Sequence, residues 1–411
     1  MKKLIWLLGC LLMMVSGVCA AEELTIVHVT DMHYLSPALT DYSDAFMEVI
    51  ENADGKVTHY TPQLMQAFVD EMLSLKPDTV ILSGDLTFNG ATQSHKDLAA
   101  LLQTLKAAGI EVLALPGNHD ANSTGYQFAD GEVYLAESLE DADFDNVYLS
   151  LGYAGAAARD TVSMSYLTEV SDKVWCLLVD TNANGTAGTV LEETFAWIES
   201  QLIRAQHQGA TVIAVSHQPV LTHNPLFTFG YVINNAGRLQ QLYAQYGVRV
   251  NLCGHLHMQH VARAGELTEI AASALAVAPN QYGILRVQDG RLAEYVMQAA
   301  DVAAWAEKTN QTDENLRNFA AYSQDFFDQT TVRQLEQMFQ DSAADAQSQA
   351  QMTEFAVRLN REYFSGVRET TADDPAWQLW QEHAGGTFFA YYMRSILQEE
   401  AQQMTAVSFK K

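Results

Sequence analysis

The sequence predicts an α/β protein in which helices cover sheets, with a helical region at its C-terminal end. Between residue 24 and about residue 298, short apolar runs of strand type alternate with amphipathic runs of helix type, which is typical of α/β layers. Beyond residue 299, glycine and β-branched runs become rare and helix-forming residues dominate. The chain has 411 residues, more than one core usually carries, so we expect a main domain over residues 21–299 and a smaller region over 300–411.

The elements of the main domain are predicted in chain order from their hydrophobic patterns. Strands are expected at residues 24–30, 79–83, 110–115, 162–170, 174–179, 211–215, 248–253, 270–278, 283–287 and 292–297. Helices are expected at residues 62–75, 94–108, 191–207 and 237–246. Asp289-Gly290 lies between the last two strands and predicts a hairpin. The acidic segment 122–160 is expected to be rich in loops.

The first twenty residues are expected to lie outside the fold. Two lysines precede an apolar run over residues 4–15, and the small residues up to Ala20 and Ala21 offer a cleavage site. The run is shorter than the ~20 apolar residues that a membrane-spanning helix needs, so we interpret residues 1–20 as a signal peptide. We therefore expect a secreted or periplasmic protein with no transmembrane helix after cleavage. A lipid anchor on Cys10 or Cys19 is the alternative.

The charge of the chain limits its partners. The formal net charge is −27 at pH 7. A surface this acidic repels nucleic-acid backbones and anionic lipids, which argues against polynucleotide binding through a basic face. An anionic substrate would need local positive charge, which metal ions could supply.

Two cysteines would remain after signal cleavage. Cys176 and Cys253 both lie in apolar runs of strand type, where a buried thiol is the ordinary expectation. The pattern does not decide whether they pair, and two cysteines do not make a disulfide scaffold.

Five polar clusters follow predicted strands of the main domain. They are Asp31-Met32-His33, Gly84-Asp85, Gly117-Asn118-His119-Asp120, Ser216-His217-Gln218-Pro219 and Gly254-His255-Leu256-His257. Side chains at the carboxyl ends of sheet strands converge in α/β architectures. The glycines permit tight turns and close approach where the strands stop. Carboxylate, amide oxygen and imidazole together suit divalent transition metals, so the clusters predict a metal centre.

In this order, the clusters resemble the signature of the calcineurin-like metallophosphoesterase family: D-x-H, G-D, G-N-H-[DE], a lone His and G-H-x-H. The resemblance covers residues 31–257 and not the helical region. It implies a layered α/β/β/α sandwich and two divalent or mixed-valence transition-metal ions, of manganese, zinc or iron. By this resemblance, one ion would be held by Asp31, His33, Asp85 and His257. The second would be held by Asp85, Asn118, His217 and His255, with Asp85 bridging the two ions.

The same resemblance implies a reaction, the hydrolysis of phosphoesters. A hydroxide held between the two metal ions would attack phosphorus in line. His119 is left unligated, so it would protonate the leaving group, and Asp120 would orient it.

The residues around the motifs favour one branch of the family. Protein phosphatases carry arginines beside the metal blocks, but residues 84–90 hold none and Pro116 stands at the second position. Phe88 replaces the tyrosine ligand of purple acid phosphatases. The motifs look most like class III cyclic-nucleotide phosphodiesterases, so we expect an exported phosphodiesterase-like enzyme acting on small or accessible phosphoesters. His223 and Asn224, in a loop rich in aromatics, are candidate substrate contacts.

Two other functions stay open. The first is a phosphomonoesterase or nucleotidase. The second is a surface interaction protein with a vestigial metal site, whose helical region presents aromatic side chains to a partner. Those aromatics, for which core packing is the simpler explanation, are Trp377, Trp380, Phe388, Phe389, Tyr391 and Tyr392. The sequence leaves the substrate, the metal identity and the oligomeric state open.

Overall fold

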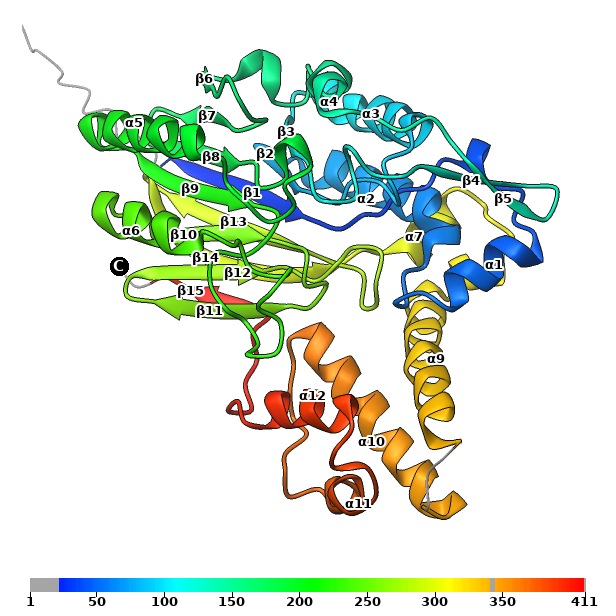
Figure 1. The fold of residues 1–411 in the computed structure, drawn as a ribbon. Helices are drawn as coiled ribbons and strands as arrows, with labels where there is room; N and C mark the ends of the chain where they lie inside the picture. Colours follow the sequence, from blue (N-terminus) through cyan, green and yellow to red (C-terminus); the bar gives the residue numbers. More distant parts are fainter. Residues whose placement is uncertain (1–21, 341–343, 410–411) are drawn as a thin grey trace, which may run out of the picture.

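The computed structural model describes residues 22–340 and 344–409, so the predicted signal peptide lies outside the described residues. Two sheets stack at the centre of the main domain (Figure 1). The first contains, in spatial order, β15 (Ala406–Ser408), β14 (Arg291–Ala299), β13 (Gln281–Gln288), β1 (Glu23–Val29), β2 (Thr79–Ser83) and β3 (Glu111–Leu115). The second contains β11 (His260–Ala264), β12 (Leu267–Ala271), β10 (Val250–Cys253), β9 (Thr211–Ser216), β8 (Val174–Val179), β7 (Tyr166–Ser171) and β6 (Ala158–Arg159).

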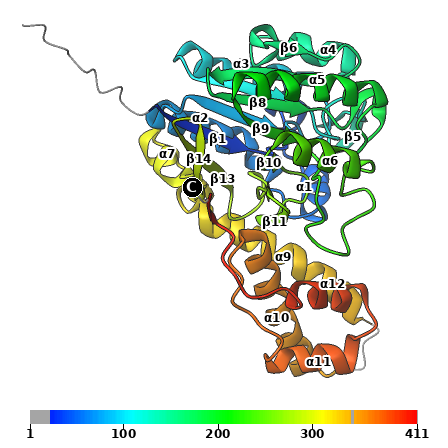
Figure 2. The same cartoon turned by 90° about the vertical axis from the view of Figure 1, so that its left-hand side faces the viewer.

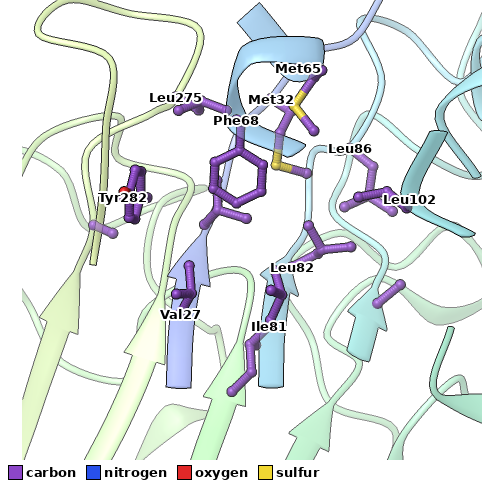
Figure 3. Packing of buried hydrophobic residues seen from close by; sticks show 14 of the residues in the cluster. Val27, Met32, Met65, Phe68, Ile81, Leu82, Leu86, Leu102, Leu275 and Tyr282 are labelled. Carbon is purple, nitrogen blue, oxygen red and sulfur yellow. The ribbon is translucent and has the colours of Figure 1, made fainter. Parts of the chain in front are cut away.

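Helices cover the outer face of each sheet, so the predicted four-layer α/β/β/α arrangement is confirmed. On the first sheet, α2 (Thr61–Leu75) and α3 (Thr92–Ala107) contribute to one core: Phe68 of α2 lies over Val27, and Leu102 of α3 lies beside Leu86, as Figure 3 shows. On the second, α5 (Glu192–Gln208) and α6 (Ala236–Tyr246) form a separate core with the sheet.

The apolar run of β8 shows why local pattern predicts these strands. All six of its residues are buried. Cys176 belongs to the core between the sheets, whereas its neighbours Trp175 and Leu177 belong to the core under α5 and α6. A strand buried on both faces needs apolar residues at every position, which the sequence supplies. Cys176 and Cys253 are both buried free thiols, so no disulfide joins them.

The strands that precede the polar clusters are mutually parallel within their sheets. β1 pairs with β2 and β2 with β3, while β8 pairs with β9 and β9 with β10, all in parallel. Parallel strands joined by helical crossovers present their carboxyl ends at one edge. The clusters of the two sheets therefore meet at one end of the sandwich.

Several segments differ from the predicted pattern. The predicted strand over 270–278 ends at Ala271 in β12, because the backbone beyond it bonds to the loops of the polar clusters instead. The Leu275 N–H donates to the Thr30 carbonyl, and the Ala276 N–H to that of Asp31. The acidic segment contains the hairpin of β4 (Tyr126–Ala129) and β5 (Glu132–Leu135) and the short helix α4 (Asp141–Val147). The helix α1 (Asp44–Glu51) and the strand β11 were also not predicted.

The C-terminal region is helical, as predicted, and extends away from the sandwich (Figure 2). It contains α7 (Val302–Lys308), α8 (Glu314–Arg317), α9 (Phe319–Phe339), α10 (Ala346–Ser365), α11 (Pro375–Ala384) and α12 (Phe388–Leu397). We call α9 to α12 the helical lobe. Trp377 and Trp380 are buried in the lobe core, which also contains Leu256 and Met258 of the main domain. Among the described residues, none of the helices combines the length and the apolar character needed to cross a membrane.

The chain returns to the main domain after α12. β15 pairs antiparallel with β14, with Val296 opposite Ala406. One strand therefore adds to the helices of the C-terminal region and extends the first sheet.

Candidate metal centre

The polar clusters bring two groups of potential ligands together. Each residue of a group offers one ligand atom within 4.8 Å of the others. The first group is Asp31, His33, Asp85 and His257, and the second is Asp85, His217 and His255. Asp85 is common to both groups. Asn118 joins the second, because its Oδ1 lies 3.1 Å from His217 Nε2. The structure thus assembles the same two sets that the family resemblance implies.

The backbone at these ligands is unusual. Asp31, His33, Asp85, His255 and His257 all have positive φ angles, between 43° and 68°. This left-handed region is unfavourable for residues with a side chain, and such strain clusters at functional sites. Hydrogen bonds between loops hold it in place: the Asp31 N–H donates to the Gly84 carbonyl and the His33 N–H to that of Asp85, each at 3.0 Å.

Glycines let the ligand loops approach one another, as predicted. A Cβ on Gly84 would lie 2.5 Å from His217 Nδ1. A Cβ on Gly117 would overlap the Asp85 carboxylate, and one on Gly254 would overlap Thr30 and Asp31. Any side chain at these positions would push the ligands apart.

The donor set fits divalent transition-metal ions. The Nε2 atoms of His33 and His257 lie 3.2 Å apart, and His257 Nε2 lies 3.4 Å from Asp31 Oδ1. Imidazole nitrogens and carboxylate oxygens that converge in a buried place are the ligands that manganese, zinc and iron accept. The fold and these ligand groups therefore form a dinuclear metal site.

The charges of the ligands depend on one another. Burial alone would raise the pKa of Asp85, but His217 and His119 hold it well below its ordinary value. Burial disfavours protonated His217, yet the Asp85 and Asp31 carboxylates raise its pKa to about 9. Concentrated negative charge at this buried place therefore attracts cations.

His119 lies beside the metal ligands but belongs to neither group. Its backbone N–H donates to Asp85 Oδ1 at 2.8 Å. Its ring packs edge-on against the His33 ring, with 5.1 Å between the ring centroids. Its Nδ1 lies 3.1 Å from the Phe88 carbonyl, which can only accept, so Nδ1 is the donor there. His119 lines the adjoining cavity and keeps Nε2 for another partner.

Asp120 does not orient His119, contrary to the prediction. Its buried carboxylate accepts hydrogen bonds from the N–H groups of Leu86, Thr87 and Gly117 at 2.8 to 3.0 Å. Burial and the Asp85 charge raise the pKa of Asp120 to about 7, which these donors oppose. Asp120 therefore ties the loop after β2 to the loop after β3 and shapes the backbone that holds Asp85.

His223 and Asn224 are not positioned to touch a substrate. Both are buried, and neither lines the cavity beside the metal ligands. His223 contacts Glu269 at 3.3 Å and His260 at 3.0 Å. The Asn224 amide donates to the Tyr363 hydroxyl and to Ser395 Oγ of the helical lobe, at 2.9 and 3.0 Å. Asn224 therefore joins the main domain to the lobe, and His223 is held within the main domain.

A cavity of about 430 Å³ adjoins the metal ligands, and the helical lobe forms its far wall. Asp85, Asn118, His119, His255 and His257 line one end, and residues of α9, α10 and α12 line the other. Sequence reasoning missed Lys56, which lies in the same lining and forms an ion pair with Asp54. Lys56 lies in a loop outside all five polar clusters, so nothing in the neighbouring sequence indicates that it lines the cavity.

A sandwich of two sheets with two sets of metal ligands at its strand ends defines a metal-dependent phosphoester hydrolase. The chain belongs to the calcineurin-like phosphoesterase family, whose family model matches residues 24–259. The region 301–403 matches a second family model, the C-terminal domain of cyclic nucleotide phosphodiesterase. The predicted family is therefore confirmed, and the helical region has a family of its own.

Proteins named as phosphodiesterases or probable phosphodiesterases are among the similar proteins. A probable cyclic nucleotide phosphodiesterase of Rhodococcus erythropolis is 26% identical over 60% of this chain and 70% of its own length. A probable glycerophosphodiester phosphodiesterase, GpdQ, of Arcobacter nitrofigilis is 24% identical over 63% of this chain and 86% of its own. A cAMP/cGMP dual specificity phosphodiesterase of Mycobacterium tuberculosis is 22% identical over 57% of this chain and 62% of its own.

Proposed function

We propose that this enzyme is an exported phosphodiesterase that hydrolyses small diesters of the cyclic-nucleotide type. One observation carries the proposal: the ligand groups open into a cavity of about 430 Å³ that the helical lobe closes on its far side. A cavity of this size fits a small molecule rather than a protein chain. The names of the relatives and of the C-terminal family support the cyclic-nucleotide type.

The charge of the cavity favours a diester over a monoester. Among the described residues, Lys56 is the one lysine or arginine that lines the cavity, and its ammonium lies 3.2 Å from Asp54 Oδ2. A monoester dianion is ordinarily held by arginine pairs, which this lining lacks. A diester carries one negative charge and needs less compensation.

We assign a separate role in the proposed reaction to the metal ions, to Lys56 and to His119. Bound metal ions would supply a hydroxide nucleophile near neutral pH and neutralise charge on the phosphate. Lys56 adds positive charge at the cavity edge. Protonated His119 donates its Nε2 proton to the leaving oxygen, while the Phe88 carbonyl fixes the ring through Nδ1.

A substrate comparison tests the proposal. We expect manganese-loaded protein to hydrolyse bis(p-nitrophenyl) phosphate and adenosine 3′,5′-cyclic phosphate with a kcat/KM at least about tenfold above that for p-nitrophenyl phosphate, and Asp85→Asn to abolish all turnover. A preference for the monoester would support the phosphomonoesterase alternative. No turnover by either protein would support the interaction-protein alternative.

Export has its own test. The two lysines followed by an apolar run support it. Mass spectrometry of the protein from the producing cells should find a mature N-terminus after Ala20 or Ala21, without a lipid. An intact Met1 would contradict export by cleavage, and a lipidated cysteine at the mature N-terminus would support the lipid-anchor alternative.

A further inference from the structure

The wall of the cavity that faces the metal ligands is aromatic. Its aromatic residues are Phe227, Tyr231, Phe327, Phe364, Phe388, Phe389 and Tyr392. Five of these seven belong to α9, α10 and α12 of the helical lobe, and the other two to the loop after β9. Apolar aromatic rings do not bind a phosphate group, so this wall would contact the organic part of the substrate.

Aromatic rings lead from the metal centre to the lobe. The Tyr231 ring lies 5.8 Å from the ring of the ligand His255 and 4.9 Å from that of Phe227. The Phe227 ring lies 5.8 Å from that of Tyr392 in α12. A substrate with its phosphate at the ligands would therefore extend along this series of rings toward α12.

Phe388 is the least covered ring of this wall. It lies at the start of α12, lines the cavity and is 66% exposed. An apolar ring left this open beside a cavity offers a face on which a flat ligand can stack. Tyr391, on the same helix and 50% exposed, does not line the cavity.

Asn360 of α10 is a polar side chain in the same lining. Its Nδ2 donates to Thr331 Oγ1 at 3.0 Å, and its Oδ1 accepts from the Tyr392 hydroxyl at 2.7 Å. These two bonds fix the amide plane and use one N–H and one lone pair. An asparagine amide has two N–H donors and two lone pairs. A second N–H and a second lone pair therefore remain, the combination that the edge of a nucleobase can match.

We propose that the helical lobe forms a base-binding subsite, in which Phe388 stacks on the nucleobase of a nucleoside phosphodiester and Asn360 bonds to the edge of the base. This inference rests on the proposed function, because it places the substrate phosphate at the metal centre. Phe388 and Asn360 are then specificity-determining residues supplied by a different part of the chain from the residues that act on phosphorus.

Two matched substrates test the subsite: adenosine 3′,5′-cyclic phosphate and ribose 3′,5′-cyclic phosphate, which lacks the base. We expect Phe388→Ala to raise KM for the first about tenfold, the range of base–aromatic stacking, and to leave the second unchanged. Phe388→Trp should restore the low KM. Tyr391→Ala is the matched control and should change neither substrate. Equal effects of Phe388→Ala on both substrates, or none on either, would overturn the subsite.

Binding separates this inference from the proposed function. Calorimetry with a hydrolysis-resistant adenosine cyclic phosphorothioate should show about tenfold weaker binding to Phe388→Ala and to Asn360→Leu than to the wild type. If the wild type hydrolyses no diester, the proposed function fails while the binding measurement still decides the subsite. Unchanged binding by both variants would overturn the inference even in an active diesterase.

Discussion

The Lys56 ammonium lies 3.2 Å from the Asp54 carboxylate at the edge of the cavity that adjoins the metal ligands. Asp54 also lies 3.6 Å from Nδ1 of His257, one of the predicted ligands. A lysine so held is a fixed charge that needs little reorganisation when an anion arrives. The pair thus links Lys56, the one lysine or arginine among the described residues that line the cavity, to the metal centre.

Replacing Lys56 should weaken catalysis on a diester. We expect Lys56→Ala to lower kcat/KM for bis(p-nitrophenyl) phosphate by about 10- to 100-fold, because it removes a charge-assisted contact to phosphate, and Lys56→Arg to retain most of it. Lys106→Ala is the matched control, since Lys106 also pairs with a nearby carboxylate, that of Glu111, away from the cavity. The test is to measure kcat/KM of the variants and the wild type by steady-state kinetics at the same metal content. Equal kcat/KM for Lys56→Ala and the wild type would contradict the assigned role.

Replacing His119 should affect poor leaving groups most. We expect His119→Gln to lower kcat for an alkoxide leaving group by about 10²- to 10⁴-fold, because proton donation is lost. The loss should be smaller for p-nitrophenolate, which leaves without a proton. Metal content, measured by elemental analysis, should be unchanged because His119 belongs to neither ligand group. The same loss for both leaving groups would rule out His119 as the proton donor.

Asn224 should contribute to stability through the lobe. We expect Asn224→Ala to lower the free energy of unfolding by about 2 kcal/mol, because two buried hydroxyls, of Tyr363 and Ser395, lose a donor. Asn234→Ala, which removes one exposed bond to Thr189, should cost less than about 0.5 kcal/mol. Urea unfolding measures both variants. If Asn224→Ala instead unfolds at the wild-type urea midpoint and has a raised KM, the result would support the prediction that Asn224 contacts the substrate.

The stability of the main domain should fall in acid, and His59 should account for part of the loss. Burial lowers the pKa of His59 from 6.5 to about 4. Below pH 6.5 the unfolded chain takes up a proton that the folded protein still excludes, so stability is lost as pH falls. Between pH 7.5 and pH 5 the loss from His59 should be about 2 kcal/mol. Urea unfolding of His59→Gln should show a pH dependence smaller by that amount. An identical pH dependence in both proteins would contradict a neutral His59.

Local sequence predicted the elements whose causes are local. The strand over 174–179 is apolar at every position because both of its faces are buried. The ligand clusters could be predicted because each one directly follows such a strand and contains Asp, Asn or His, which rarely serve a purely structural role at the end of a buried strand. Glycines 84, 117 and 254 added the close approach that the structure shows.

The features that escaped prediction depend on distant partners. Lys56 reaches the cavity because the next residue, Val57, bonds to the Ala276 carbonyl, more than two hundred residues away. The Asp120 carboxylate bonds to the loop of Leu86 and Thr87, and its position next to His119 in sequence says nothing of this. His223 and Asn224 follow a ligand block, yet Glu269, Tyr363 and Ser395 determine their surroundings. None of these partners can be read from a window of neighbouring residues.

The pairing of β14 with β15 gives the C-terminal region an unusual place in the chain. Everything between Ala299 and Ala406 is one excursion between neighbouring antiparallel strands, since Val296 lies opposite Ala406. Its two ends are adjacent in space, which is the geometry that tolerates the insertion of whole modules. The excursion can therefore be treated as a cassette: exchanging it at these two junctions with that of a relative should transplant substrate preference while leaving the chemistry of the sandwich intact.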